Sequence, residues 1–313
     1  MDQDFRTQVV TTMCTKQTAS LVAAFVIALM PAQPLNAQAP SVLKDPNIEI
    51  KYQAPTKSKF IPQDKLLEDA KKWLEERQVL ERFGQLITPL RLPQKLLLTA
   101  RTCDEPNAYY NHKEVSIIIC YEFIPNIRLL ALKQQVMGPK HAKNKDFIKG
   151  AGIAKDDVEV GGLAFAMLHE VGHMVFHLFE IPVFGRNEDA ADQVAAFLSL
   201  KFSPPLTQRL IKGGAAFLYG DAADSQTLAQ FADEHGSPTQ RFMNVFCIAY
   251  GSNPQAYQYI VGPQLLPKER AAGCAEEYKQ VERAFTKTIE PHLDKARVEA
   301  LKARKSSLAF GFK

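Results

Sequence analysis

The stretch Leu168-His169-Glu170-Val171-Gly172-His173-Met174-Val175-Phe176-His177 is the most informative part of this 313-residue chain. Residues four apart lie on one face of a helix, so His169 and His173 can offer two imidazole nitrogens to one metal ion. Glu170 is offset by about 100° around the helix axis, which lets it reach a water molecule on that ion. The spacing therefore predicts a zinc site with Glu170 as the general base.

A core helix with two hydrogen-bonded histidines is the plainer explanation of this HExxH pattern, which arises by chance in roughly 1% of chains this long. The flanking residues argue against it, because Phe165, Ala166, Leu168, Val171 and Val175 make the helix apolar. Burying a glutamate and two histidines without partners costs free energy, and a bound metal ion removes that cost. We therefore expect a metal site here.

The third metal ligand is expected on the next segment, Glu188-Asp189-Ala190-Ala191-Asp192. A turn at Pro182 and Gly185 would let this helix fold back on the first one. We assign Glu188 to the metal, and Asp192, on the same helix face, to the free ring nitrogen of a ligand histidine. Asp189 and Asp192 remain rivals for the ligand role, and a solvated acidic helix start is the alternative.

His177 lies on the same face as the two histidines, four residues after His173. Metzincins place their third histidine six residues after the second and beyond a glycine, a pattern that is absent here. We therefore expect His177 to be a packing or surface residue.

These residues resemble the gluzincin metallopeptidases, which carry two histidines on one helix, a glutamate on the next and an aspartate one turn later. The matching positions are His169, Glu170, His173, Glu188 and Asp192. The interval from His173 to Glu188 is shorter than in the thermolysin-like members. The resemblance implies a zincin-like α+β fold with one Zn²⁺ per chain.

The segment Asn107-Ala108-Tyr109-Tyr110 is similar to the edge strand above the zinc of thermolysin-like enzymes. That similarity implies that Asn107 and Ala108 bind a peptide substrate by strand addition. An ordinary hairpin strand is the alternative.

Gluzincins usually add a histidine or tyrosine that stabilises the tetrahedral oxyanion. His235 is our candidate for this catalytic role, because it stands in a polar segment before a helix start. Arg241 and Tyr250 are alternatives, and His235 as a polar loop residue without a catalytic role is a further one.

The mature chain as a whole resembles a family of exported bacterial proteins regarded as zinc metallopeptidases of unknown substrate. The matching features, besides the segments quoted above, are Cys120-Tyr121-Glu122, Gln240-Arg241-Phe242-Met243-Asn244, Cys247, Tyr250, Gly251 and Pro291-His292-Leu293. This resemblance implies a fold and a metal, and no particular substrate.

The N-terminal segment predicts export. A short apolar run, residues 19–30, follows Arg6 and Lys16, and small residues then offer a cleavage site after Ala37. Residues 1–37 therefore predict a signal peptide and a periplasmic or secreted protein without stable membrane insertion after cleavage. The alternative is an uncleaved membrane anchor, for which the run is short.

Four cysteines remain after cleavage: Cys103, Cys120, Cys247 and Cys274. An even number in an exported protein predicts two disulfides, with three possible pairings. We prefer the pairs that are nearest in sequence, Cys103 with Cys120 and Cys247 with Cys274. Four buried free thiols are the alternative.

The rest of the chain predicts an extended lead-in over 38–62 and one metallopeptidase domain over 63–313. Its sheet-containing part spans about 63–157, with strands at 95–100 and 115–120. Between them, residues 107–114 form a strand and turn that lead into the second strand, so we expect antiparallel pairing. Its helical part spans about 158–313. The predicted helices are 63–86, 121–136, 161–180, 187–202 capped by Asn187, 225–234, 238–250 capped by Ser237, and 268–300, with a loop over 138–157.

Composition excludes one class of partner. Hydrophobic residues make up 46% of the chain and charged residues 23%, and the net charge of +4 is too small to indicate nucleic-acid binding.

The predicted function is zinc-dependent hydrolysis of peptide bonds in a peptide or protein substrate. The alternatives are a non-catalytic exported zinc-binding or protein-interaction module, and a structural domain without metal.

Overall fold

The computed structural model describes residues 45–137, 153–220, 232–263 and 265–303, all within the unit Val42–Lys313. The predicted signal peptide and most of the predicted helix 225–234 and loop 138–157 lie outside these ranges. Residues 232–234, at the end of that predicted helix, are not helical. No helix in the described ranges is long and apolar enough to span a membrane.

Four strands form one sheet in the order β1-β2-β4-β3: β1 (Ile48–Tyr52), β2 (Leu96–Arg101), β4 (Ser116–Cys120) and β3 (Ala108–Asn111). The α+β prediction is confirmed, and so is the antiparallel pairing of the strand within 107–114 with the strand at 115–120, which are β3 and β4. The prediction that the whole sheet is antiparallel is wrong. Strand β2 pairs in parallel with both β1 and β4, and only β3 and β4 are antiparallel.

The chain path explains this pairing. After β2 the chain crosses to the far edge of the sheet before β3 begins, and the turn after β3 returns it as β4 between β3 and β2. Strand β4 therefore runs in the direction of β2. Strand β1 lies in the predicted lead-in, where its short alternation of exposed and half-buried residues was not recognised as a strand.

Both predicted disulfides are present, Cys103–Cys120 and Cys247–Cys274. The first joins the crossing segment after β2 to the end of β4. The fully buried carboxylate of Glu122 accepts hydrogen bonds from the amides of Cys103 and Asp104 in the same segment. The segment that leads into β3 is therefore held both covalently and by a buried carboxylate.

Removing the second disulfide is expected to destabilise the helical part. Cys247 and Cys274 are fully buried and 27 residues apart, so Cys247→Ala/Cys274→Ala should lower the free energy of unfolding by about 3 to 4 kcal/mol. Urea unfolding followed by circular dichroism measures this. An unchanged unfolding midpoint in the variant would show that the bridge contributes nothing to stability.

The first two helices cover the β1–β2 half of the sheet. The prediction of a single helix over 63–86 is wrong, because α1 (Asp64–Glu76) and α2 (Val79–Ile87) are separated by a bend at which Gln78 has a φ of 51°. The bend turns α2 onto the strands, where Gly84 packs against the side chains of Leu98 and Ile48. Sequence periodicity alone does not report such a bend.

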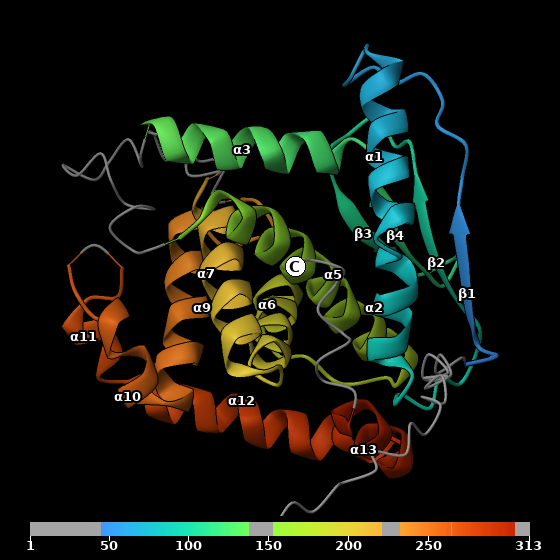
Figure 1. Cartoon of the computed structure of the whole chain (residues 1–313). Helices are drawn as coiled ribbons and strands as arrows, with labels where there is room; N and C mark the ends of the chain where they lie inside the picture. The colour runs from blue at the N-terminus through green and yellow to red at the C-terminus, as the bar shows by residue number, and fades with distance from the viewer. Residues whose placement is uncertain (1–44, 138–152, 221–231, 264, 304–313) are drawn as a thin grey trace, which may run out of the picture. The chain divides into compact units, whose positions relative to one another are not determined.

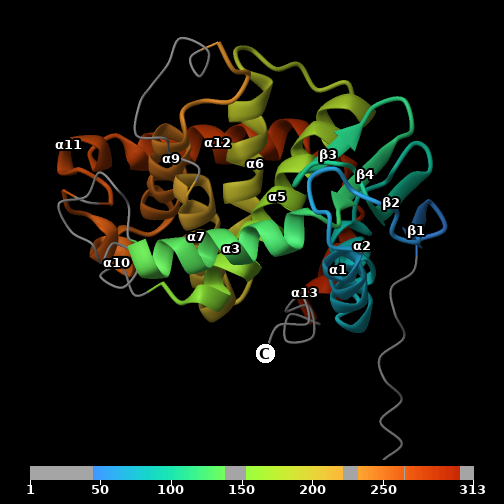
Figure 2. The ribbon, with the colours of Figure 1, turned by 90° about the horizontal axis from the view of Figure 1, so that it is seen from above.

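The other helices in the described ranges are α3 (Phe123–Met137), α5 (Lys155–Leu178), α6 (Asn187–Ser199), α7 (Pro204–Gly220), α9 (Pro238–Ser252), α10 (Pro254–Tyr257), η1 (Gln258–Ile260), α11 (Lys268–Ala271), α12 (Cys274–Thr288), η2 (Glu290–His292) and α13 (Lys295–Ala303). Helix α5 packs against β3 and β4 and also against α3, α6 and α7 (Figure 1 and Figure 2). It therefore connects the sheet to the helical part.

Several helix boundaries differ from prediction. Helix α5 begins at Lys155 and α6 ends at Ser199, and α7 is an additional helix that begins at the proline pair Pro204-Pro205. Proline is tolerated in a first helical turn, since its missing N–H would be unpaired there. The predicted helix 268–300 is divided into α11, α12, η2 and α13. The start of α9 is confirmed, because Ser237 caps it by accepting a hydrogen bond from the Gln240 amide.

Glycines bring α7 against α5. A Cβ atom at Gly213 would lie 1.6 Å from the carbonyl oxygen of Asp157, and one at Gly161 would lie 2.6 Å from the Cα of Gly213. Only glycine permits this approach, so α5 is held closely on the side opposite the sheet.

Candidate metal centre

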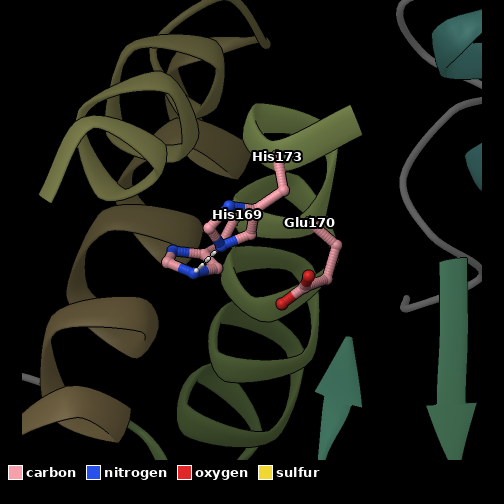
Figure 3. A group of neighbouring side chains, drawn as sticks. All are labelled: His169, Glu170 and His173. Atoms are coloured by element: carbon pink, nitrogen blue, oxygen red, sulfur yellow. Dashed lines mark hydrogen bonds between the residues drawn. The ribbon is translucent and has the colours of Figure 1, made fainter. Parts of the chain in front are cut away.

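The C-terminal half of α5 carries His169, Glu170 and His173 (Figure 3). His169 is 5% exposed and Glu170 is 6% exposed, so both are buried in the interior. A dashed line in Figure 3 joins the two imidazole rings, whose Nε2 atoms are 3.0 Å apart. Helical geometry alone therefore brings these two nitrogens together, as the spacing predicts.

Helix α6 folds back along α5 and supplies a carboxylate. The two helices touch at Gly172, where a Cβ atom would lie 2.8 Å from the Cα of Ala191. This approach places Glu188 Oε2 at 2.9 Å from His169 Nε2 and 3.3 Å from His173 Nε2. Two imidazole nitrogens and one carboxylate oxygen therefore converge on one point.

A divalent transition metal fits this donor set. Tetrahedral bonds of about 2.0–2.1 Å place the ligand atoms of a zinc-sized ion about 3.3 Å apart, close to the 2.9–3.3 Å separations of the three donors. The donors also fall into two overlapping groups that could hold an ion: His169, Glu170 and His173, and His169, Glu188 and His235. The rival ligand Asp189 belongs to neither group.

The second nitrogen of each imidazole ring is also engaged. His169 Nδ1 lies 2.8 Å from Asp192 Oδ1, and Arg241 holds that carboxylate through Nε at 2.6 Å and a second guanidinium nitrogen at 2.8 Å. His173 Nδ1 lies 2.9 Å from Asn187 Oδ1. Both Nε2 atoms are thereby oriented toward Glu188.

Asn187 was missed as a site residue. It was predicted to cap α6, but Arg186 is the cap residue and Asn187 is the first residue of the helix. Its position directly before Glu188 is the only feature of the sequence that could have indicated a role in the site. Its contact with His173 depends on how α6 lies against α5, which the sequence does not show.

The charges of the site are strongly coupled. Burial by itself would lower the pKa of His169, but its hydrogen bonds to Asp192 and Glu188 raise that pKa to about 9. Burial would raise the pKa of Glu188, but hydrogen bonds from three histidines hold it well below its usual range. The pKa of Glu170 is raised by burial, although His169 and His173 partly offset that effect.

Metal binding is expected to release a proton at neutral pH. With a pKa of about 9, His169 is protonated in the metal-free chain at pH 7, and a metal ion must displace that proton. The apparent affinity should therefore rise with pH up to about 9, by about tenfold per pH unit from this group alone. Isothermal titration calorimetry in buffers of different ionisation enthalpy counts the released protons. A pH-independent affinity between pH 6 and 8 would contradict this assignment.

His235 lies beside the predicted ligands rather than apart from them. Its Nε2 is 2.9 Å from Glu188 Oε2, its Nδ1 is 3.1 Å from Asp233 Oδ1, and its side chain is 46% exposed. Of the alternatives for the oxyanion role, Arg241 also lines the cavity beside the cluster, but its guanidinium is bound to Asp192. Tyr250 packs against the hydrophobic core.

A cavity of about 520 Å³ opens onto the cluster and is bounded on one side by β3. Asn107 and Ala108 line it, and the amide of Tyr110 donates a 2.7 Å hydrogen bond to Glu170 Oε2. That bond shows that the free edge of β3 faces α5. Three phenylalanine side chains also line the cavity, Phe123, Phe165 and Phe217.

Comparison with known proteins identifies one similarity. A family model described as "Putative metallopeptidase" matches residues 61–289, which include β2 to β4, the HExxH pattern and the acidic start of α6. No curated protein and no solved structure matches the chain.

Proposed function

Because this chain belongs to the DUF4344 family, described as "Putative metallopeptidase", we propose that it is a zinc peptidase that hydrolyses peptide bonds. One observation carries the proposal. His169 Nε2, His173 Nε2 and Glu188 Oε2 lie within 3.3 Å of one another, beside the buried Glu170 carboxylate. The fold would then be zincin-like, with the metal helix below an edge strand.

His169, His173 and Glu188 would hold one Zn²⁺ per chain. Asp192 and Asn187 would orient the two imidazoles through their Nδ1 atoms. When bound, zinc would polarise the substrate carbonyl and lower the pKa of a water molecule.

Glu170 would act as general base and then as general acid. Its Oε2 accepts the Tyr110 amide, which leaves the other carboxylate oxygen for the attacking water. Burial raises the pKa of Glu170, which makes the carboxylate a better proton acceptor. Glu170 would take one proton from the water as the water oxygen bonds to the carbonyl carbon. It would then give that proton to the amide nitrogen as the C–N bond breaks and the amine leaves.

The substrate would lie along the free edge of β3. A peptide in extended form would pair with the backbone near Asn107 and Ala108 as an added strand. The phenylalanine side chains in the cavity lining, Phe123, Phe165 and Phe217, would favour an apolar substrate side chain.

A non-catalytic zinc module is the second candidate, and His235 is the observation that favours it. His235 Nε2 is 2.9 Å from Glu188 Oε2, so it could complete a set of four protein ligands. Closed four-ligand zinc sites are structural, whereas catalytic sites keep one position open. The two candidates therefore assign His235 different roles, as oxyanion donor or as ligand.

The variant His235→Ala is expected to retain zinc and to lose about 10²- to 10³-fold in kcat, the usual effect of removing an oxyanion donor. Zinc titration and hydrolysis of a fluorogenic peptide are measured on the same preparation. A marked loss of zinc affinity would instead assign His235 as a fourth ligand and favour the non-catalytic module.

The two disulfides fit a protein outside the reducing cytoplasm. We place it in the periplasm or in the secreted fraction, with residues 1–37 as its signal peptide. Mass spectrometry of the N-terminus of protein exported from its native host tests this, and cleavage after Ala37 is the expected result.

The proposed function is tested with purified protein and a library of fluorogenic peptides. Hydrolysis that 1,10-phenanthroline abolishes and added Zn²⁺ restores is the expected result. A well-folded, zinc-loaded protein that cleaves no peptide in the library would favour the non-catalytic module.

A further inference from the structure

Tyr110 contacts α5 at two points. Its amide donates to Glu170 Oε2 at 2.7 Å, and its phenol oxygen lies 2.8 Å from His177 Nδ1. Glu170 and His177 are seven residues apart, so they lie on one helix face about 10 Å from each other along the axis. The buried side chain of Tyr110, which is 7% exposed, therefore extends along α5 from one to the other.

Glu170 depends on this contact. Within the described part of the chain, the Tyr110 amide is the only group that donates a hydrogen bond to the Glu170 carboxylate. The direction of that carboxylate therefore follows from where β3 lies along α5. Strand β3 is an edge strand of four residues that pairs with β4 on one side only, so its other side needs a separate attachment.

His177 provides that attachment. Its ring centroid lies 4.8 Å from that of His112 and 5.7 Å from that of Tyr110, so the three rings form one cluster. Burial raises the pKa of Tyr110 to about 12, so the phenol keeps its proton at neutral pH and can donate it to Nδ1. His177 is exposed and packs against other rings, as the sequence predicts, and it also contacts the Tyr110 phenol.

We propose that His177 is a positioning residue for the general base: it holds the Tyr110 phenol, which sets β3 along α5 so that the Tyr110 amide orients Glu170. The expected effect on kcat rests on the proposed function. The link from His177 through Tyr110 to Glu170 can be tested even if the protein hydrolyses no peptide.

Kinetics test the catalytic consequence. Tyr110→Phe and His177→Ala should each lower kcat by about 10- to 100-fold with little change in KM or zinc content, because the carboxylate is misplaced. The double variant should be no worse than either single one, since both remove the same link. His177→Asn should recover most of the activity, because its amide oxygen can replace Nδ1 as acceptor.

Matched controls lie away from the site. Tyr278→Phe removes a phenol that donates to Glu282 at 3.0 Å, and His292→Ala removes a ring stacked on Phe179. Both should leave kcat unchanged. A fall in kcat in these controls as large as in Tyr110→Phe, or an unchanged kcat in His177→Ala, would overturn the proposal.

An NMR experiment tests the link independently of hydrolysis. In protein labelled with ¹⁵N at its nine tyrosines, the Tyr110 amide signal is the one lost in Tyr110→Phe. The chemical shift of this signal should change in Glu170→Gln and in His177→Ala, and should stay near its wild-type value in His177→Asn. The Tyr110 amide proton should exchange with solvent at least about tenfold faster in His177→Ala than in the wild type.

The two experiments separate the two kinds of failure. If the Tyr110 amide keeps its chemical shift and exchange rate in His177→Ala, the positioning proposal is overturned whether or not the protein hydrolyses peptides. If both change in a protein that cleaves no peptide, the link from His177 to Glu170 is upheld and only the proposed function is refuted.

Discussion

The variant Glu170→Gln is expected to lose hydrolysis by about 10³-fold or more while its zinc content stays unchanged. Glutamine has nearly the same size and can still accept the Tyr110 amide, so the edge strand keeps its place. It cannot take a proton from the attacking water. The loss should therefore appear in kcat, measured with a fluorogenic peptide, while metal analysis gives the same zinc content as the wild type.

A second glutamate provides the control. Glu180 is exposed and follows the end of α5, so Glu180→Gln should retain wild-type kcat. Glu170→Asp keeps the charge but shortens the side chain by one methylene, and its kcat should lie between those of Glu170→Gln and the wild type. A fully active Glu170→Gln would show that another group activates the water and would end the proposed mechanism.

The variant His169→Ala is expected to remove the metal. The wild type should contain about one zinc per chain and the variant almost none, because His169 is the donor that both candidate metal groups share. Chelation should lower the melting temperature of the wild type by roughly 10 °C, if zinc is present at about 1,000 times its Kd, and should not change that of the variant. Elemental analysis and differential scanning calorimetry measure the two effects.

The remaining contacts of the site should allow His169→Ala to fold. Asp192 keeps both bonds to Arg241, and Glu188 keeps His173 and His235 as partners, so no carboxylate is left buried and unpaired. His292→Ala should retain full zinc content. Equal melting temperatures of the wild type with and without a chelator, together with no metal in the wild type, would support a structural domain without metal.

The candidate metal centre shows how much a local pattern can predict. The spacing of His169 and His173 predicts that their side chains meet, and their Nε2 atoms are 3.0 Å apart because both lie on one helix, whose geometry depends only on residues within a turn. The acidic start of the next segment likewise pointed to Glu188 and Asp192, since Pro182 and Gly185 favour a reversal between the two helices. The disulfide pairs followed from their short separations.

Contacts between distant segments could not be predicted in this way. Arg241 comes from α9 and Tyr110 from β3, and no local pattern shows that they meet Asp192 and Glu170. His177 was assigned to packing or the surface for the same reason. Its partner lies 67 residues away in the sequence.

The sequence by itself determined which residues form the candidate metal centre, the residue proposed as general base, the disulfides and the α+β class, because these follow from residue type and short-range periodicity. Tertiary structure decided the parallel pairing of β4 with β2, the bend at Gln78, and the contacts of Asn187 with His173, of Arg241 with Asp192 and of Tyr110 with Glu170. These features depend on where the chain reverses direction and on which helix and strand surfaces can approach each other, as the helices do at Gly172 and Gly213. Packing between segments that are far apart in the sequence determines the reversals and the approaches.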